Sequence, residues 1–462
     1  MNLTQLLHAI KDMSSRGPQE LVQLLQQLKV SEDSLRSQSQ KVLEALPHLD
    51  PARESLGCLF FLHIVGNIGM PDHGSHQFLV AATRFLSTCD VEQIRLAPDK
   101  FVALCRQVRD HAVALRSPKL AVSPLKDGLQ KLAPSPEHVT PIHADFAFSC
   151  LQAKHYNAAA SVLEQTILDV EPAKTSMKPT DLLLYCYYGG MIHIGRRKYP
   201  EALHMFVQGL TAPTFVVNAI TIATYKKYAL VSLIHSDASP GGSDSQFDLL
   251  QFAGSVTALP KFTPSSVSRF IKSEAQSYID LASAYSSKKQ QDLPSAIEKH
   301  QARFLEACSC PSSDGNMGLV KLVLAGRTKR AIQKLTQTFL TLSLADIAQQ
   351  VGLKTATEAE SHILRMVGAG EIFAEIDASA GMVRFLEDPE QYTSTSAVQH
   401  LNATIQASFA LAEKLQSINR QVSLDPAYVS KLYAKDKGDR FPEDPSDFDA
   451  EPQSLAYSFQ DG

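Results

Sequence analysis

The stretch that decides the fold covers residues 338–385, TFLTLSLADIAQQVGLKTATEAESHILRMVGAGEIFAEIDASAGMVRF. Ser343 is followed three residues later by Asp346, which predicts a capped helix start with an acid in its first turn. Gly352 is placed to end this helix in a left-handed conformation. The helix has an apolar face made of Leu344, Ile347, Ala348 and Val351.

A second helix and a hairpin follow within the same stretch. Thr357 and Glu360 predict the second helix start by the same capping pattern, and its apolar face holds Ala359, Ile363, Met366 and Val367. Apolar residues then alternate on two predicted strands that flank the turn ASAG, namely Ile372, Ala374 and Ile376 before it and Val383 and Phe385 after it. Helix, turn, helix and hairpin together predict a winged helix.

The charge of this stretch argues against DNA as its ligand. It holds three basic and six acidic side chains, a formal charge of −3. Glu358 and Glu360 lie in the first turn of the second helix, where a groove-reading helix presents donors to base edges. Binding to a duplex requires several phosphate contacts from Lys or Arg. A winged helix that binds nucleic acid is therefore the less favoured alternative.

The hairpin suggests a different use of the same shape. An unpaired strand edge can accept a strand from another chain. We therefore predict that this region contacts partner proteins through Ile372, Phe373, Ile376, Val383 and Phe385.

The chain before this stretch has the pattern of stacked helices. Leu21, Leu24, Leu25 and Leu28 form one helical stripe, and no segment alternates with period two for long. Residues 187–213 match the tetratricopeptide spacing, and two weaker echoes lie upstream. The small residues of these repeats, where two helices cross, are Ala121, Ala159 and Ala202. The alternative is an irregular set of helices.

Beyond the hairpin, a long amphipathic helix is expected. Its apolar stripe consists of Val398, Leu401, Ile405, Phe409, Ala412 and Leu415. An apolar face after a complete domain requires a partner, and we favour a foreign helix bundle over the chain's own array. The predicted organisation of this mostly α protein is a helical repeat array over 1–325, a winged-helix subdomain over 331–388, a C-terminal helix region over 392–432 and a disordered acidic tail over 433–462.

The composition indicates an intracellular protein. The 462 residues carry a net charge of −4, without the basic excess of a dedicated nucleic-acid binder. Seven irregularly spaced cysteines fit buried thiols better than a disulfide framework. The start lacks a secretory signal pattern, and the apolar run 56–70 is too short to span a membrane. We expect no membrane partner.

Catalytic and metal motifs are missing from the sequence. None of the fifteen histidines forms H-x-H, and the pair His73 and His76 is a weak metal signal. Cys308 and Cys310 lack a second ligand pair, which favours a loop with free thiols. The basic runs GRRKY (195–199) and GRTKR (326–330) fit solvated turns and helix ends better than RNA binding. We expect no enzyme activity, no cofactor and no metal.

Several segments resemble the PCI-domain family, in which a helical array runs into a winged helix. The similar segments are SLADIAQQVGL, AESHILRMVGAGEIFAEID, GMVRFLEDPEQY, YYGGMI, YKKYALVSLI, NMGLVK, IQKLTQTFLTLSL, ESLGCLFFL and IRLAPDKFVALC. They extend from about residue 50 to about residue 430 and are most similar to the PCI subunits of the COP-nine signalosome. The resemblance places the helical part of the PCI domain at roughly 190–330, and residues 236–256 look inserted.

The resemblance implies a non-catalytic scaffold. The signalosome removes a ubiquitin-like modifier from cullins and so regulates cullin–RING ubiquitin ligases, and a metalloprotease subunit of the MPN fold performs the cleavage. The expected partners are other PCI and MPN subunits, joined through winged-helix edge strands and a C-terminal helix bundle. The expected location is the nucleus and the cytoplasm. A PCI subunit of the proteasome lid or of translation initiation factor three is the alternative within the same class.

Overall fold

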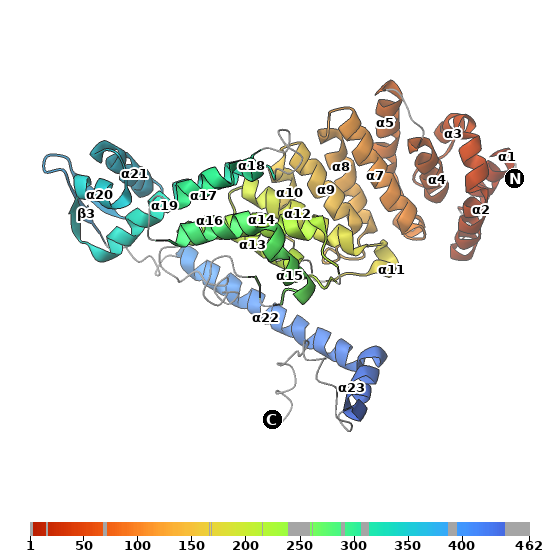
Figure 1. The fold of residues 1–462 in the computed structure, drawn as a ribbon. Helices are drawn as coiled ribbons and strands as arrows, with labels where there is room; N and C mark the ends of the chain where they lie inside the picture. Colours follow the sequence, from red (N-terminus) through yellow and green to blue (C-terminus); the bar gives the residue numbers. More distant parts are fainter. Residues whose placement is uncertain are drawn as a thin grey trace. The chain divides into compact units, whose positions relative to one another are not determined.

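The computed structural model describes residues 3–14, 17–67, 72–165, 167, 169–214, 216–238, 259–260, 262–287, 292–305, 314–386 and 395–438. The chain divides into two compact units, Met1–Leu386 and Glu387–Gly462. The first unit is a series of stacked helices that leads into a small three-stranded sheet (Figure 1). The predicted mostly α architecture, with repeats followed by a winged helix, is confirmed.

The N-terminal part of the first unit is built around one buried helix. Its elements are α1 (Leu3–Met13), α2 (Pro18–Ser37), α3 (Ser39–Ala45), the 3-10 helix η1 (Leu46–His48), α4 (Ser55–Gly66), α5 (Asp72–Thr88) and α6 (Val91–Ile94). Helix α4, SLGCLFFLHIVG, has no acidic, Lys or Arg residue, and every residue from Ser55 to Val65 is buried. Because α4 is apolar all round, α2, α3, α5 and α7 (Pro98–Ala114) pack around it.

The middle of the array consists of stacked helix pairs. Its helices are α7 (Pro98–Ala114), α8 (Lys119–Leu132), α9 (Pro141–Gln152), α10 (Tyr156–Leu163), α11 (Pro172–Thr175), α12 (Pro179–Gly195) and α13 (Tyr199–Thr211). The three predicted crossing alanines are fully buried in α8, α10 and α13. At the α12–α13 crossing, a Cβ on Gly190 would lie 2.6 Å from Cζ of the buried Phe206. The glycine therefore permits the close packing of α12 on α13.

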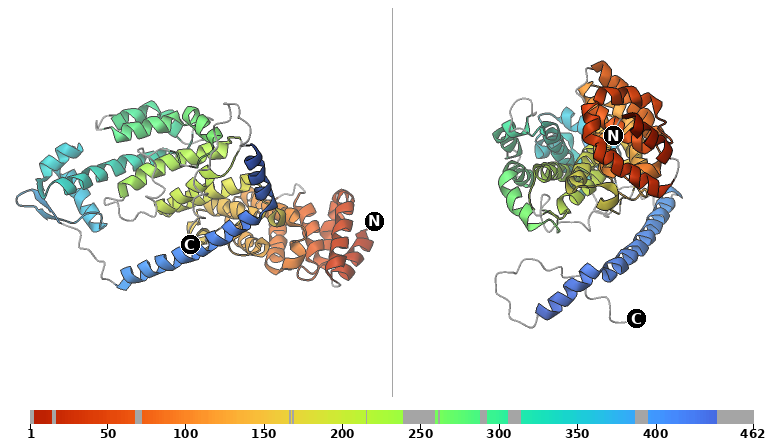
Figure 2. Two further views of the ribbon diagram at one scale, coloured as in Figure 1. Left: turned by 90° about the horizontal axis from the view of Figure 1, so that it is seen from below. Right: turned by 90° about the vertical axis from the view of Figure 1, so that its right-hand side faces the viewer.

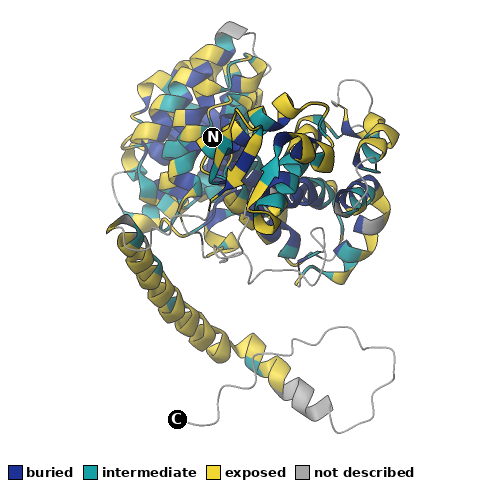
Figure 3. Ribbon diagram, turned by 90° about the vertical axis from the view of Figure 1, so that its left-hand side faces the viewer, coloured by how far each residue is buried: buried dark blue, intermediate teal, exposed yellow. Residues whose placement is uncertain are grey.

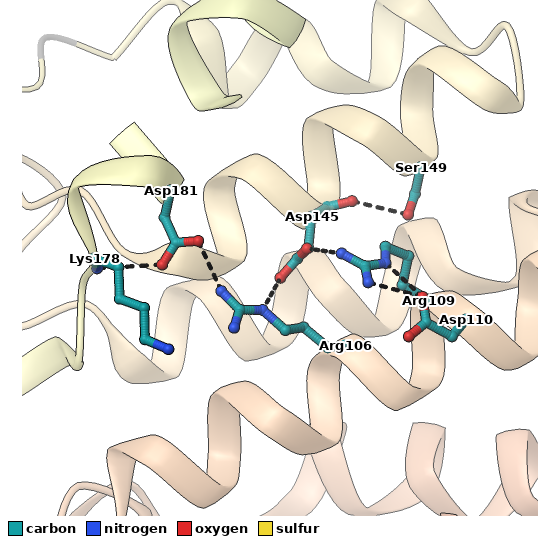
Figure 4. A network of polar contacts seen from close by, with 7 residues as sticks. All are labelled: Arg106, Arg109, Asp110, Asp145, Ser149, Lys178 and Asp181. Atoms are coloured by element: carbon teal, nitrogen blue, oxygen red, sulfur yellow. Dashed lines mark hydrogen bonds and ion pairs between the residues drawn. The ribbon is translucent and has the colours of Figure 1, made fainter. Parts of the chain in front are cut away.

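A polar network ties the first helices of three successive pairs together (Figure 4). Arg106 of α7 reaches Asp145 of α9 at 3.4 Å and Asp181 of α12 at 2.8 Å. Arg109 of α7 also pairs with Asp145. Burial raises the pKa of Asp145, and the arginines oppose that shift by favouring the ionised carboxylate. The network links the three helices through Asp145 and Asp181, two carboxylates that solvent barely reaches.

The predicted boundary between array and winged helix falls inside the last helix of the array. The last helices of the array are α14 (Ala219–Ala238), α15 (Ser265–Glu274), α16 (Gln276–Ser286), α17 (Asp292–Lys299), α18 (Gln301–Phe304) and α19 (Met317–Thr338). Helix α19 packs on α14 and α17 of the array and on α20 (Leu344–Val351) and α21 (Ala356–Gly368) of the winged helix. Array and winged helix thus share one continuous helix (Figures 1 and 2), and no break exists at 325–331.

The winged helix contains β1 (Thr341–Ser343), α20 (Leu344–Val351), α21 (Ala356–Gly368), β2 (Ala374–Asp377) and β3 (Met382–Phe385). Ser343 caps α20 by accepting a hydrogen bond from Asp346 N at 3.1 Å, as predicted. Gly352 ends α20 with φ 78°. The prediction for α21 was two residues off: its cap is Thr355, which accepts from Glu358 N at 3.2 Å. Two threonines in TAT match the capping pattern, and the tertiary structure selects the earlier one.

The second unit contains α22 (Thr395–Leu424) and α23 (Pro426–Gly438). The predicted helix region therefore consists of two helices that meet at Asp425. Helix α23 extends to Gly438, past residue 433, where the tail was predicted to begin. Residues 439–462, Cys308 and Cys310, and all but the first helical residues of 236–256 lie outside the described residues.

Candidate assembly surfaces

The sheet of the winged helix has β3 at its centre. Its strand order is β1-β3-β2, with both pairs antiparallel. The sequence predicted only the hairpin, because the three residues of β1 run directly into the Ser343 cap and are too few to show a strand period. Strand β2 is paired on one side only among the described residues, so it is the edge that the hairpin prediction anticipated.

Backbone hydrogen bonds identify which groups of β2 are free. Leu386 N donates to Phe373 O at 2.8 Å, whereas Phe385 N donates to Leu340 of the opposite neighbour at 2.9 Å. Since hydrogen-bonded pairs alternate along an antiparallel ladder, the backbone groups of Glu375 and Asp377 also face β3. Those of Ala374 and Ile376 face away from the sheet. These two residues offer the N–H and C=O groups that an added strand requires.

The side chains of the predicted contact residues divide into two groups. Ile372, Val383 and Phe385 are buried with α20 and α21 in the subdomain core. Their side chains are not available to a partner, and the sequence could not show this because both faces of a short hairpin look alike. Phe373 and Ile376 are half-buried at the edge strand. A partner contact through these two residues stays a prediction.

The electrostatics of the subdomain disfavour phosphate groups. At the wing tip, hydrogen bonds from Ser379 and Ala380 hold the pKa of Asp377 below its usual value. At the start of α21, the Glu358 carboxylate accepts from Lys354 N at 3.0 Å. Both acids are thus fixed where a DNA-binding winged helix places donors. The charge argument from the sequence applies to the folded surface as well.

A basic run within α19 joins the array to the winged helix. Lys329 Nζ lies 2.5 Å from Glu371, which follows α21. The Arg330 guanidinium lies 5.9 Å from the ring centroid of Tyr285 in α16. The sequence indicated a turn or helix end for GRTKR. Instead the run lies inside a helix, and its side chains reach the elements on both sides.

The second candidate surface is the apolar stripe of α22, a helix whose described residues are mostly exposed (Figure 3). Its predicted residues Val398, Leu401, Ile405, Phe409 and Leu415 are each 44–67% exposed. The stripe continues through Ile418 and Val422, which the sequence prediction did not include. Exposed apolar patches of this kind mark binding sites. None of the described helices combines the length and hydropathy required to cross a bilayer.

One group of side chains has metal-ligand spacing among the described residues. Potential ligand atoms of His138, Asp169 and Glu171 lie within 4.8 Å of one another. The Lys174 ammonium lies 2.9 Å from the Glu171 carboxylate and opposes a bound cation. His138 Nε2 lies 3.4 Å from a carboxylate oxygen of Asp169. We interpret the group as an ion-paired link between two loops.

The described cysteines are unsuited to nucleophilic chemistry. Cys58, Cys89, Cys105, Cys150 and Cys186 are free and buried. Burial raises the pKa of Cys58 to about 12 and has the same effect on Cys186. A thiol with so high a pKa holds little thiolate at neutral pH.

A helical repeat array that shares its last helix with a winged helix defines a PCI-domain protein. The comparison with family models agrees. Residues 18–240 match the model described as "COP9 signalosome complex subunit 3, N-terminal helical repeats", and residues 312–387 match the PCI domain.

Two curated relatives extend the match over nearly the whole chain. COP9 signalosome complex subunit 3 of Arabidopsis thaliana is 37% identical over 442 residues, 96% of each chain. The protein of the same name from Dictyostelium discoideum is 34% identical over 427 residues, 92% of this chain and 94% of its own. The chain therefore belongs to the COP9 signalosome subunit 3 family, whose members are PCI subunits of a multi-subunit complex.

Proposed function

We propose that the chain is a non-catalytic scaffold subunit of the COP9 signalosome, the complex that deneddylates cullins and regulates cullin–RING ubiquitin ligases. The exposed apolar stripe of α22 carries this proposal, since a helix that presents Leu401, Phe409 and Leu415 to water requires a protein partner. The buried cysteines with raised pKa values are consistent with a role other than catalysis.

Two surfaces carry the assembly in this proposal. The outer edge of β2 joins the winged helix of a neighbouring PCI subunit through the backbone of Ala374 and Ile376. Helix α22 joins a bundle with helices of other PCI and MPN subunits. Cullin–RING ligases are reached indirectly, through the assembled complex, and the complex acts in the nucleus and the cytoplasm.

A pull-down of the tagged chain from cells, with mass spectrometry of the captured proteins, tests the assignment. We expect the full set of signalosome subunits at matching amounts. Capture of proteasome-lid or initiation-factor subunits instead would assign the chain to another complex of the same class. A chain that migrates only as a monomer in native extract would contradict the scaffold role.

Two variants test the two surfaces separately: Ala374→Pro tests the β2 edge, and truncation before Val398 tests helix α22. Ala374→Pro removes an outward N–H from the β2 edge and is compatible with an edge strand. Glu375→Pro removes an inward N–H from the β2–β3 ladder and is the control that damages the fold itself. We expect Ala374→Pro to retain the melting temperature and lose winged-helix pairing, while truncation before Val398 leaves the first unit folded and weakens assembly. Unchanged assembly in both would contradict the proposed surfaces.

Direct nucleic-acid binding is the competing function and has a simple test. The scaffold proposal expects no salt-dependent binding to duplex DNA or RNA at low ionic strength. Binding that disappears when Lys354, Arg365 and Arg384 are changed to Glu would support the competitor.

A further inference from the structure

Three helix pairs of the array share one turn structure with a basic residue at its strained position. Ser117 N, His155 N and Lys198 N each donate to the carbonyl five residues earlier, at 3.0, 2.9 and 2.9 Å. The residues just before them are left-handed: Arg116, Lys154 and Arg197 have φ of 53°, 54° and 61°.

Glycine is the usual residue at this position. A side chain there costs roughly 1–2 kcal/mol. Each of the three basic residues stands five places before a crossing alanine, so they occupy the same position of successive repeats. Strained residues of this kind are concentrated at functional sites.

A cavity of about 450 Å³ lies between the second and third of these turns. Its lining includes Lys154, His155 and Asn157 from one turn and Arg196 and Lys198 from the next. The five side chains supply hydrogen-bond donors from two repeats to one space. The basic run GRRKY, which the sequence assigned to a solvated turn, thus forms one wall of a cavity.

The positive charge of this cavity is only partly neutralised. Glu164 accepts from Arg196 at 3.1 Å and from Lys198 at 3.2 Å. Arg196 Nη1 is buried and has no hydrogen-bond acceptor within the described residues. Lys154 is exposed and has no ion pair in the part of the chain that the structure describes. The Lys154 ammonium therefore remains available to an additional anion.

The two helices that begin at the cavity add to its preference for anions. His155 and Lys198 occupy the N-cap positions of α10 and α13, and neither helix has a side-chain cap hydrogen bond. Ser, Thr, Asp or Asn is preferred at such positions, because their oxygen atoms satisfy free N–H groups. An anion in the cavity would complement the positive ends of both helices.

We propose that this cavity binds a phosphate group carried by a phosphoserine or phosphothreonine of a partner protein. Lys154, Arg196 and Lys198 line the cavity, and the two acids that pair with Arg196 and Lys198 are Glu164 and Glu201, so one positive charge remains for an anion such as a phosphate group. A phosphate also offers enough acceptor oxygens for donors from both turns. Because Lys154 and His155 are exposed at the rim, the phosphate can enter while attached to a peptide.

Fluorescence anisotropy of a labelled peptide Gly-Ala-pSer-Ala-Gly, titrated with the full-length chain at low salt, tests the proposal. We expect saturable binding that weakens as salt rises. Lys154→Gln should weaken it about tenfold, the effect of one charge-assisted hydrogen bond. The matched control Arg116→Gln removes the same charge from the same left-handed position, but outside this cavity, and should leave affinity within about twofold.

Three comparisons decide the outcome once circular dichroism shows both variants folded. Absence of saturable binding, or equal loss in the two variants, would overturn the site. A peptide with Glu in place of phosphoserine that binds equally well would overturn the preference for phosphate. Inorganic phosphate that competes at the same concentration as the phosphopeptide would indicate a site for free phosphate and contradict the peptide-borne source.

Discussion

Helices α4 and α22 use apolar residues in opposite ways. Every residue of α4 from Ser55 to Val65 is buried, and neighbouring helices cover all its sides. Helix α22 has 30 residues, yet Leu401, Phe409 and Leu415 are more than half exposed. A helix that is apolar all round is buried in the core of its own unit. A helix with an exposed apolar stripe binds a partner outside its own unit. This contrast predicts which changes harm folding and which harm assembly alone.

The largest effect is expected from a charge in the core around α4. Leu59 is fully buried, so Leu59→Asp places a carboxylate without a partner among apolar side chains. The free energy of unfolding should fall by about 4 kcal/mol or more. Urea denaturation followed by circular dichroism measures it. A loss below about 1 kcal/mol would show that α4 is not central to the core.

The matched change in α22 is Phe409→Asp. Because Phe409 is 64% exposed, the free energy of unfolding should change by less than about 0.5 kcal/mol. The same variant should fail to co-purify with the complex. A variant that is as destabilised as Leu59→Asp would mean that the stripe packs within this chain, and the contrast between the helices would disappear.

A smaller effect is expected at the α12–α13 crossing. Gly190→Ala forces the buried ring of Phe206 to move and should cost about 1–3 kcal/mol. The control is Gly318→Ala in α19, where the added methyl group has no neighbour within 4 Å among the described residues, apart from the adjoining residues and the nearby backbone of its own helix. That change should stabilise the helix by up to about 1 kcal/mol. Melting temperatures that shift in the same direction for both variants would contradict the packing role of Gly190.

Buried His143 should make stability depend on pH. Burial lowers its pKa to about 4 in the folded chain, while the unfolded value stays near 6.5. The unfolded state therefore binds more protons between these values, and the free energy of unfolding falls as pH drops from about 6.5 to about 4. His143→Gln should flatten this slope, measured by urea unfolding at pH 4.5, 5.5 and 6.5. If the slope is unchanged, the pH dependence of the free energy of unfolding comes from His63 and His193, whose pKa values burial also lowers.

The smallest effect concerns the junction of array and winged helix. Lys329 and Glu371 are each about one third exposed, so their coupling should be roughly 0.5 kcal/mol. A double-mutant cycle with Lys329→Met and Glu371→Gln measures it. A coupling near zero would show that packing of α19 on α20 and α21 holds the junction without this pair.

Local signals predicted most of the winged helix. The Ser343 cap, the Gly352 stop and the alternation along β3 depend on residues within one helical turn or strand. The cap of α21 was predicted at Thr357 and lies at Thr355, because both threonines are followed three residues later by a glutamate. Strand β1 was missed because its pairing with β3 joins residues about 40 positions apart, which no short pattern reveals.

The candidate site was predicted in part. The exposed stripe of α22 follows from helix periodicity, and the structure places those side chains in solvent within their unit. Ile372, Val383 and Phe385 were predicted to contact a partner, but their side chains are buried in the subdomain core; alternation shows that a strand has two faces without showing which one is covered. The free backbone groups of Ala374 and Ile376 depend on the ladder with β3.

The sequence by itself determined the helical class, the crossing alanines, the winged helix and its acidic balance, because periodicity, caps and charge are local properties. Only the tertiary structure decided that α19 belongs to both array and winged helix, that β3 is central and that Arg196 and Lys154 line one cavity. Each of these features depends on contacts between segments that are distant along the chain. The free energy of such contacts comes from residues that no short stretch of sequence contains together.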